Sequence, residues 1–163
     1  MLLAAESHQR LEAFLREHFR RPTLRLPPLY FYGGRFAGWL TRSFHIGAIT
    51  FGRHIFVLPD LIERSGEGRL TVPGWLAAHE ATHVLQFERA GVAGFLITYL
   101  RGYWRALRSQ KRWDAKAHMQ AYLTITEECD AREAEKAYTE WRKGETARPE
   151  ENENVALSSH PIL

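Results

Sequence analysis

The chain of 163 residues contains a single cysteine, Cys129, which excludes an internal disulfide framework. It also lacks any apolar run near the roughly 20 residues that a membrane-spanning helix requires. Met1–Ala5 is too short for the apolar core of a signal peptide, and no basic flank precedes it. From these absences we expect a cytoplasmic protein.

Acidic residues are scarce over most of the chain and gather at its end. Residues 1–126 hold 17 Lys or Arg and 9 Asp or Glu, whereas residues 127–163 hold 5 and 10. A basic body with an acidic end is as consistent with internal pairing as with an anionic partner. The content of 45% hydrophobic and 25% charged residues is typical of a globular domain with a buried core.

Residue spacing predicts an α+β fold, with one domain over residues 1–143. Its parts are an N-terminal helix over 4–19, a sheet region over 24–58 and a helical region over 74–143, followed by a mobile tail over 144–163. Pro27 and Pro28 restrict residues 24–32 to an edge strand or an extended segment.

The clearest strand pattern is a hairpin of residues 44–51 and 54–58, joined at Gly52-Arg53. Residues 60–73 are expected to form a short helix or a loop. Apolar spacing then predicts a helix over 74–90 that ends at Gly91, and a second helix over 92–109. Residues 114–124 and 126–143 form either one long helix or two.

The motif with chemical content is His79-Glu80-Ala81-Thr82-His83, an HExxH pattern. Two histidines four residues apart lie on one face of a helix, one turn from each other, and can reach the same metal ion. Glu80 then lies beside the ion, where its carboxylate can accept a proton from a water that attacks a carbonyl. Small neighbours on this helix let an ion or another backbone come close.

A catalytic zinc site needs a third protein ligand. A metzincin would have a histidine six residues after His83, but that position is Arg89. The remaining candidates are His118 and a carboxylate of the acidic segment 127–133. The spacing alone leaves this choice open, because most acidic clusters are solvated helix faces.

Three segments resemble small gluzincin-like zinc peptidases (minigluzincins), the minimal relatives of thermolysin. Leu76–Gln86 resembles their active-site helix, Ala48–Val57 the hairpin before it, and Glu128–Arg132 their glutamate helix. The resemblance covers roughly residues 44–138 and is most specific in the first segment.

The resemblance implies that His79, His83 and Glu128 bind Zn²⁺, with Glu80 as the catalytic base. Glu127 and Glu133 are the alternatives for the third ligand. It also implies a peptide or protein substrate that lies extended along an edge strand of the hairpin. Tyr122 and His118 are candidate donors to the oxyanion of the transition state.

Other functions remain open at this stage. A non-catalytic zinc-binding scaffold could bind a peptide or a membrane partner, and a zinc hydrolase could act on a non-peptide bond. Residues 99–113 interleave aromatic and basic side chains, as in membrane-surface or single-stranded nucleic-acid contacts. We favour an amphipathic helix with its aromatic residues toward the core, which favours neither partner but leaves contact with a membrane surface open.

Overall fold

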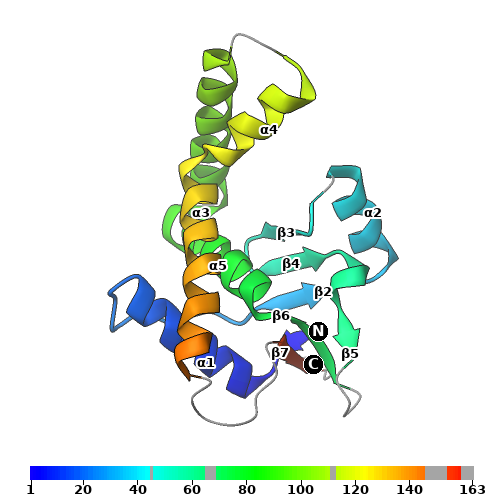
Figure 1. Ribbon diagram of the computed structural model, residues 1–163, viewed down its shortest axis with the longest axis vertical. Coiled ribbons are helices and arrows are strands. Elements are labelled where there is room, and N and C mark those ends of the chain that lie inside the picture. Colours follow the sequence, from blue (N-terminus) through cyan, green and yellow to red (C-terminus); the bar gives the residue numbers. More distant parts are fainter. Residues whose placement is uncertain (45, 65–68, 111–112, 146–153, 159–163) are drawn as a thin grey trace.

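The computed structural model describes residues 1–163 except 45, 65–68, 111–112, 146–153 and 159–163. Helices pack against a small mixed sheet, which confirms the α+β prediction (Figure 1). The helices are α1 (Ala5–His18), α2 (Arg35–Phe44), α3 (Gly74–Ser109), α4 (Ala115–Leu123) and α5 (Thr126–Glu145), with a 3₁₀ turn at Pro59–Leu61.

The sheet has the strand order β3-β4-β2-β1-β7-β6-β5. Its strands are β1 (Leu2–Leu3), β2 (Tyr30–Tyr32), β3 (Ala48–Phe51), β4 (His54–Val57), β5 (Glu63–Arg64), β6 (Leu70–Pro73) and β7 (Asn154–Ser158). Only β2 and β4 pair in parallel; the other described pairs are antiparallel. The predicted hairpin is present as β3 and β4, and β3 forms one edge of the sheet.

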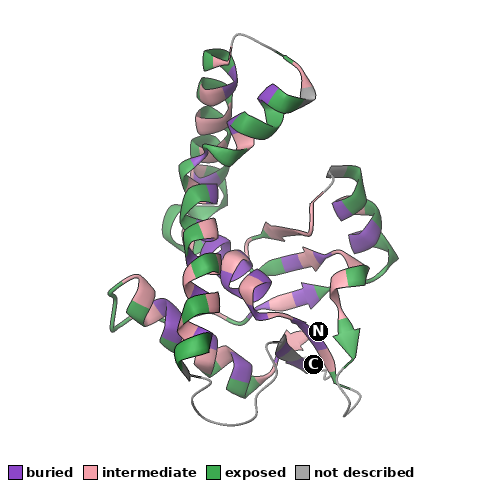
Figure 2. Ribbon diagram, in the orientation of Figure 1, coloured by how far each residue is buried: buried purple, intermediate pink, exposed green. Residues whose placement is uncertain are grey.

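The core lies between the sheet and helices α1, α3 and α5 (Figure 2). Helix α1 buries Leu11, Phe14 and Leu15, and the ring of Phe14 lies 5.0 Å from that of Tyr138 in α5. Burying each of these side chains stabilises the fold by about 1.5–3 kcal/mol. This packing holds α5 beside α3, where the candidate ligands face one another.

Helix α2 corrects the predicted start of the hairpin, because Phe44 ends a helix and the strand begins only at Ala48. Its buried residues Ala37 and Thr41 repeat at helical spacing, which the sequence analysis missed. Gly38 on this helix packs against the 3₁₀ turn. A Cβ there would lie 3.0 Å from Cγ of Pro59, so a larger residue would require the proline ring to shift by a few tenths of an ångström.

Three segments of the sheet also differ from the sequence prediction. Residues 24–32 are expected to form at most an edge strand, but β2 lies inside the sheet between β4 and β1. Pro27 and Pro28 precede this strand, so they remove no hydrogen bond from its ladder. Segment 60–73 contributes β5 and β6 in place of the expected short helix or loop. Asn154–Ser158, predicted as part of a mobile tail, pairs with both β1 and β6 and buries Val155 and Leu157. Residues 146–153 and 159–163 of that predicted tail lie outside the described residues.

The long helix α3 is broken at Gly91, as predicted, with φ 68° and ψ 164°. Beyond this break the second half of α3 packs on α4, and together they form a helical arm that projects from the body (Figure 1). The sequence left open whether residues 114–143 form one long helix or two, and they form two separate elements, α4 and α5. No helix in the described part of the chain is long and apolar enough to cross a membrane.

Replacing Gly91 with alanine is expected to lower the free energy of unfolding by about 1–3 kcal/mol, because this backbone conformation is almost restricted to glycine. A Cβ at Gly91 would touch nothing within 4 Å, so the loss of stability would come from the strained backbone conformation and not from a steric clash. Urea unfolding measures it. Gly94→Ala is the matched control, since a Cβ there would make only an ordinary 3.5 Å contact and should be neutral or stabilising. Equal effects of the two changes would contradict this account of the break.

Candidate metal centre

The first half of α3 presents both histidines of the HExxH motif toward α5. Its small residues Ala77, Ala78 and Ala81 are fully buried, which allows the sheet and α5 to approach the helix closely. Because His79 and His83 are one turn apart, their rings lie side by side, with centroids 5.0 Å apart. The sequence therefore determines locally how these two side chains face a common point.

Helix α5 supplies the third member of the group. Its buried face carries Ala131 and Ala134, and Glu128 lies one turn before Ala131 on that face. Contact between α3 and α5 places the Glu128 carboxylate opposite the two histidines, although 45 residues separate it from His83 in sequence. Glu128 is only 4% exposed.

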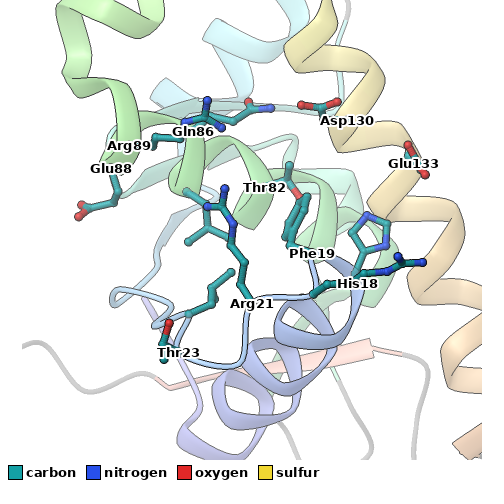
Figure 3. Close-up of a pocket in the computed structure, with 13 residues that line it drawn as sticks. His18, Phe19, Arg21, Thr23, Thr82, Gln86, Glu88, Arg89, Asp130 and Glu133 are labelled. Carbon is teal, nitrogen blue, oxygen red and sulfur yellow. The ribbon is translucent and has the colours of Figure 1, made fainter.

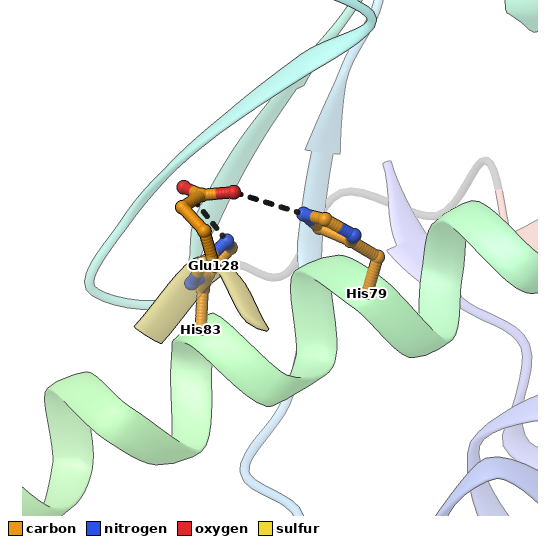
Figure 4. A group of neighbouring side chains, drawn as sticks. All are labelled: His79, His83 and Glu128. Carbon is orange, nitrogen blue, oxygen red and sulfur yellow. Dashed lines mark ion pairs between the residues drawn. The ribbon is translucent and has the colours of Figure 1, made fainter. Parts of the chain in front are cut away.

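His79, His83 and Glu128 form a group that could hold a metal ion (Figure 4). One ligand atom from each lies within 4.8 Å of the other two. Nε2 of His79 is 3.8 Å from Oε2 of Glu128, and Nε2 of His83 is 3.6 Å from Oε1. Both distances are too long for hydrogen bonds. They are close to the separation of about 3.3 Å between ligands on a tetrahedral metal with bonds of roughly 2.0–2.1 Å.

The Glu128 carboxylate shows most directly that this group suits a cation. Its Oε2 is buried and has no hydrogen-bond partner among the described residues. A buried carboxylate oxygen without a partner is costly, and pairing it with a cation offsets that cost. Two imidazole nitrogens and one carboxylate oxygen are donors that a divalent transition metal accepts.

Outside this group, Glu135 orients the ring of His79. Nδ1 of His79 lies 3.1 Å from Oε2 of Glu135, which is two turns beyond Glu128 on α5. A carboxylate that accepts a hydrogen bond from Nδ1–H leaves the lone pair of the neutral ring on Nε2, which is the nitrogen directed at Glu128. Burial lowers the pKa of His79 from its ordinary value of 6.5, so the ring is neutral at neutral pH. Partial burial raises the pKa of Glu135.

Gln86 fixes His83 by a similar arrangement. Its Nε2 donates to the backbone oxygen of Glu127 at 3.1 Å, and a carbonyl can only accept. The amide oxygen of Gln86 therefore faces Nδ1 of His83, at 2.9 Å, and Nδ1 must be the donor. In the neutral ring the lone pair then lies on Nε2, toward Glu128.

Replacing Gln86 with leucine is expected to weaken metal binding about 10–100-fold, because His83 loses the acceptor that fixes its ring and tautomer. Competition with a chromogenic chelator measures the change. Arg89→Leu is the matched control, one turn further along α3 and without a hydrogen bond to any ligand. A Gln86→Leu protein that binds zinc as tightly as the Arg89→Leu protein would contradict the assignment.

The second carboxylate of the motif, Glu80, lies beside the group without joining it. It is 4% exposed, and its Oε2 accepts a hydrogen bond of 2.6 Å from Oγ1 of Thr50 in the edge strand β3. Glu80 is also close enough to His79 for its charge to act on that ring, while its role as a base stays a prediction. Its contact with Thr50 links the site to the free edge of the sheet.

Two tyrosines enclose Glu128. The hydroxyl of Tyr99 in α3 donates to Oε1 of Glu128 at 2.9 Å. Tyr122 of α4 interacts with the same carboxylate and also lies near Glu80. Burial first, then the charge of Glu128 and hydrogen bonding to it, raise the pKa of both tyrosines. Both hydroxyls therefore remain protonated donors at neutral pH.

The other ligand candidates from the sequence do not reach the group. His118 is exposed on α4 and hydrogen-bonds Tyr103. Glu127 contributes its backbone oxygen to Gln86, and Glu133 is exposed on α5. Cys129 is exposed and its thiol faces the backbone oxygen of Leu123.

A separate groove of about 710 Å³ lies on another side of α3 (Figure 3). Side chains from the end of α1, the loop after it, α3 and α5 line it, and none of the three grouped residues does. Gln86 is the residue common to the groove and to the surroundings of the metal centre.

Glu135, Gln86, Tyr99 and Thr50 are the site residues that the sequence analysis missed. Two of them carried a usable signal: Gln86 follows His83 by three residues and Glu135 follows Glu128 by seven, which are same-face spacings on a helix. Tyr99 and Thr50 reach the site only through tertiary packing.

Comparison with models of protein families, with curated proteins and with solved structures found no match to this chain. The family resemblance of the three segments therefore rests on their residues alone. What the structure itself contributes is a His-His-Glu group that could hold a metal ion, with a buried glutamate beside it.

Proposed function

We propose that this protein is a zinc-dependent hydrolase that cleaves peptide bonds in a peptide or protein substrate, with Glu80 as general base. The observation that carries the proposal is the pairing of a His79-His83-Glu128 group with a second buried carboxylate next to it. A binding scaffold needs the three ligands but has no use for Glu80, whose burial costs free energy.

Zinc is the metal that this donor set suits best. Two histidine nitrogens and one glutamate oxygen are the ligands of catalytic zinc in thermolysin-like sites, and they leave one coordination position open. When bound, zinc lowers the pKa of water and polarises a carbonyl.

Residues of the chain would carry out the proton transfers and stabilise the transition state. Glu80, held by Thr50, would accept the proton of the attacking water and pass it to the leaving amine. Tyr122, protonated and near both Glu80 and Glu128, is the stronger candidate for the oxyanion donor. His118 is less suited because it is exposed and bonded to Tyr103.

The position of β3 supports a peptide as the substrate. This strand lies at the edge of the sheet and pairs only with β4 in the described part of the chain. An extended peptide could add beside it through main-chain hydrogen bonds. Thr50 of β3 touches Glu80, so a peptide placed there would pass close to the base.

Mass spectrometry of a mixture of unstructured peptides incubated with the zinc-loaded protein tests the proposal. We expect cleavage at a limited set of bonds, its loss after chelation, and its return on adding zinc. The chelated protein carried through the same steps is the control for a contaminating protease. Identical products with and without zinc would contradict the proposal.

A further inference from the structure

The helical arm carries an exposed apolar stripe on the second half of α3. Ile97, Leu100 and Trp104 are 66%, 52% and 47% exposed, and their spacing of three and four residues aligns them along one side of the helix. The side of the helix that carries Tyr103 and Ala106 is covered, because both pack against the cluster of Leu107 with Ala117 and Ala121 of α4. The prediction that the aromatic residues of 99–113 face the core is wrong for Trp104 and Trp113.

Basic residues border this stripe on one side. Arg101, Arg105 and Arg108 follow one another along α3 and, with Trp104, line a shallow depression of about 530 Å³. None of these three arginines forms an ion pair with another described residue. Trp113, 64% exposed, lies near Trp104, with ring centroids 6.1 Å apart.

The charge of the arm is strongly one-sided. No Asp or Glu occurs between Glu88 and Asp114, whereas this stretch holds six basic residues. The carboxylate of Asp114 accepts the backbone N–H of Ala117 and so caps α4. The whole chain has a net charge of only +3, so the positive charge is concentrated on the arm.

We infer that this face of the arm, formed by Ile97, Leu100, Arg101, Trp104, Arg105 and Arg108, docks on the surface of an anionic lipid bilayer. The aliphatic and indole side chains enter the boundary between headgroups and acyl chains, while the guanidinium groups contact lipid phosphates. A helix with an apolar stripe, a basic border and tryptophan at the boundary is suited to lie in that interface.

Two other occupants fit these observations less well. A nucleic acid would satisfy the arginines, but its phosphate backbone offers nothing to Ile97 and Leu100. A second copy joined through the same face would bring like arginines together, which opposes association. The inference does not depend on the proposed hydrolysis, and it can fail without affecting the metal centre.

Flotation with vesicles tests the inference on the full chain. We expect binding to vesicles of phosphatidylglycerol mixed with phosphatidylcholine, little binding to phosphatidylcholine alone, and release by high salt. The triple change R101Q/R105Q/R108Q should weaken partitioning about a hundredfold. The double change I97Q/W104Q should weaken it about tenfold or more.

Matched controls separate this face from general charge and hydrophobicity. R25Q/R42Q/R64Q removes three arginines elsewhere, and F36Q/W39Q removes two exposed aromatic residues of α2; both should bind like the original protein. The circular dichroism spectrum and the urea midpoint should be unchanged in all four variants, which shows that they fold whether or not the protein binds zinc. The inference is overturned by absence of vesicle binding, by equal binding of test and control variants, or by equal binding to neutral vesicles. It is also overturned if the protein does not bind vesicles and I97Q/W104Q instead abolishes dimerisation or DNA binding.

Discussion

Replacing Glu80 with glutamine is expected to reduce peptide hydrolysis about 10²–10⁴-fold while zinc remains bound. The amide keeps the size of the side chain and can still contact Thr50, but it cannot accept a proton from water. Zinc binding should persist because Glu80 is not one of the three grouped residues. The measurement is the cleavage rate of a peptide identified by mass spectrometry, at saturating zinc.

Glu88→Gln is the matched control for this change. Glu88 lies on the same helix but pairs with Arg53 at 2.8 Å on the surface, away from the histidines. Its replacement should leave the rate unchanged. If Glu80→Gln also retained full activity, the water would have another base, and the role assigned to Glu80 would be wrong.

Replacing Glu128 with glutamine is expected to weaken zinc binding more than a hundredfold, since removal even of an outer partner of a ligand costs 10–100-fold. The same change should raise the stability of the metal-free protein by about 1 kcal/mol, because it removes a buried charge whose Oε2 has no partner among the described residues. Zinc titration and urea unfolding without metal measure the two effects. Their opposite signs distinguish loss of a ligand from misfolding.

Glu127→Gln and Glu133→Gln are controls with the same chemical change on the same helix. Both should bind zinc as the original protein does, since neither carboxylate belongs to the group. In the original protein, zinc at about a hundred times its dissociation constant should add about 2.7 kcal/mol to the free energy of unfolding. Equal zinc affinity in all three variants would contradict Glu128 as a ligand.

The parts of the site that follow from local periodicity could be predicted from sequence. A spacing of four residues places His79 and His83 on one face of any α-helix, so their convergence needs no tertiary information. The break at Gly91 and the β3-β4 hairpin are likewise local features. Glu128 could be selected from its neighbours only through the family resemblance, because several residues in 127–133 had suitable chemistry.

What could not be predicted depends on how distant elements pack. Thr50 reaches Glu80 only because β3 lies against α3, and Tyr99 reaches Glu128 only because α3 bends at Gly91 before meeting α4 and α5. Strand β7 was predicted as part of a mobile tail because the polar residues on either side of it dominate the composition of residues 144–163. Its two buried residues, Val155 and Leu157, show the alternation of a strand, but the stretch is short.

The most direct test of the account is the zinc content of the purified protein, measured by elemental analysis beside His79→Ala, His83→Ala, Glu128→Gln and Glu80→Gln variants. The account predicts about one zinc ion per chain in the original protein and in Glu80→Gln, and loss of zinc from the other three. A protein that takes up no zinc when zinc is added, or ligand variants that retain it, would contradict the metal centre and the hydrolase proposed on it.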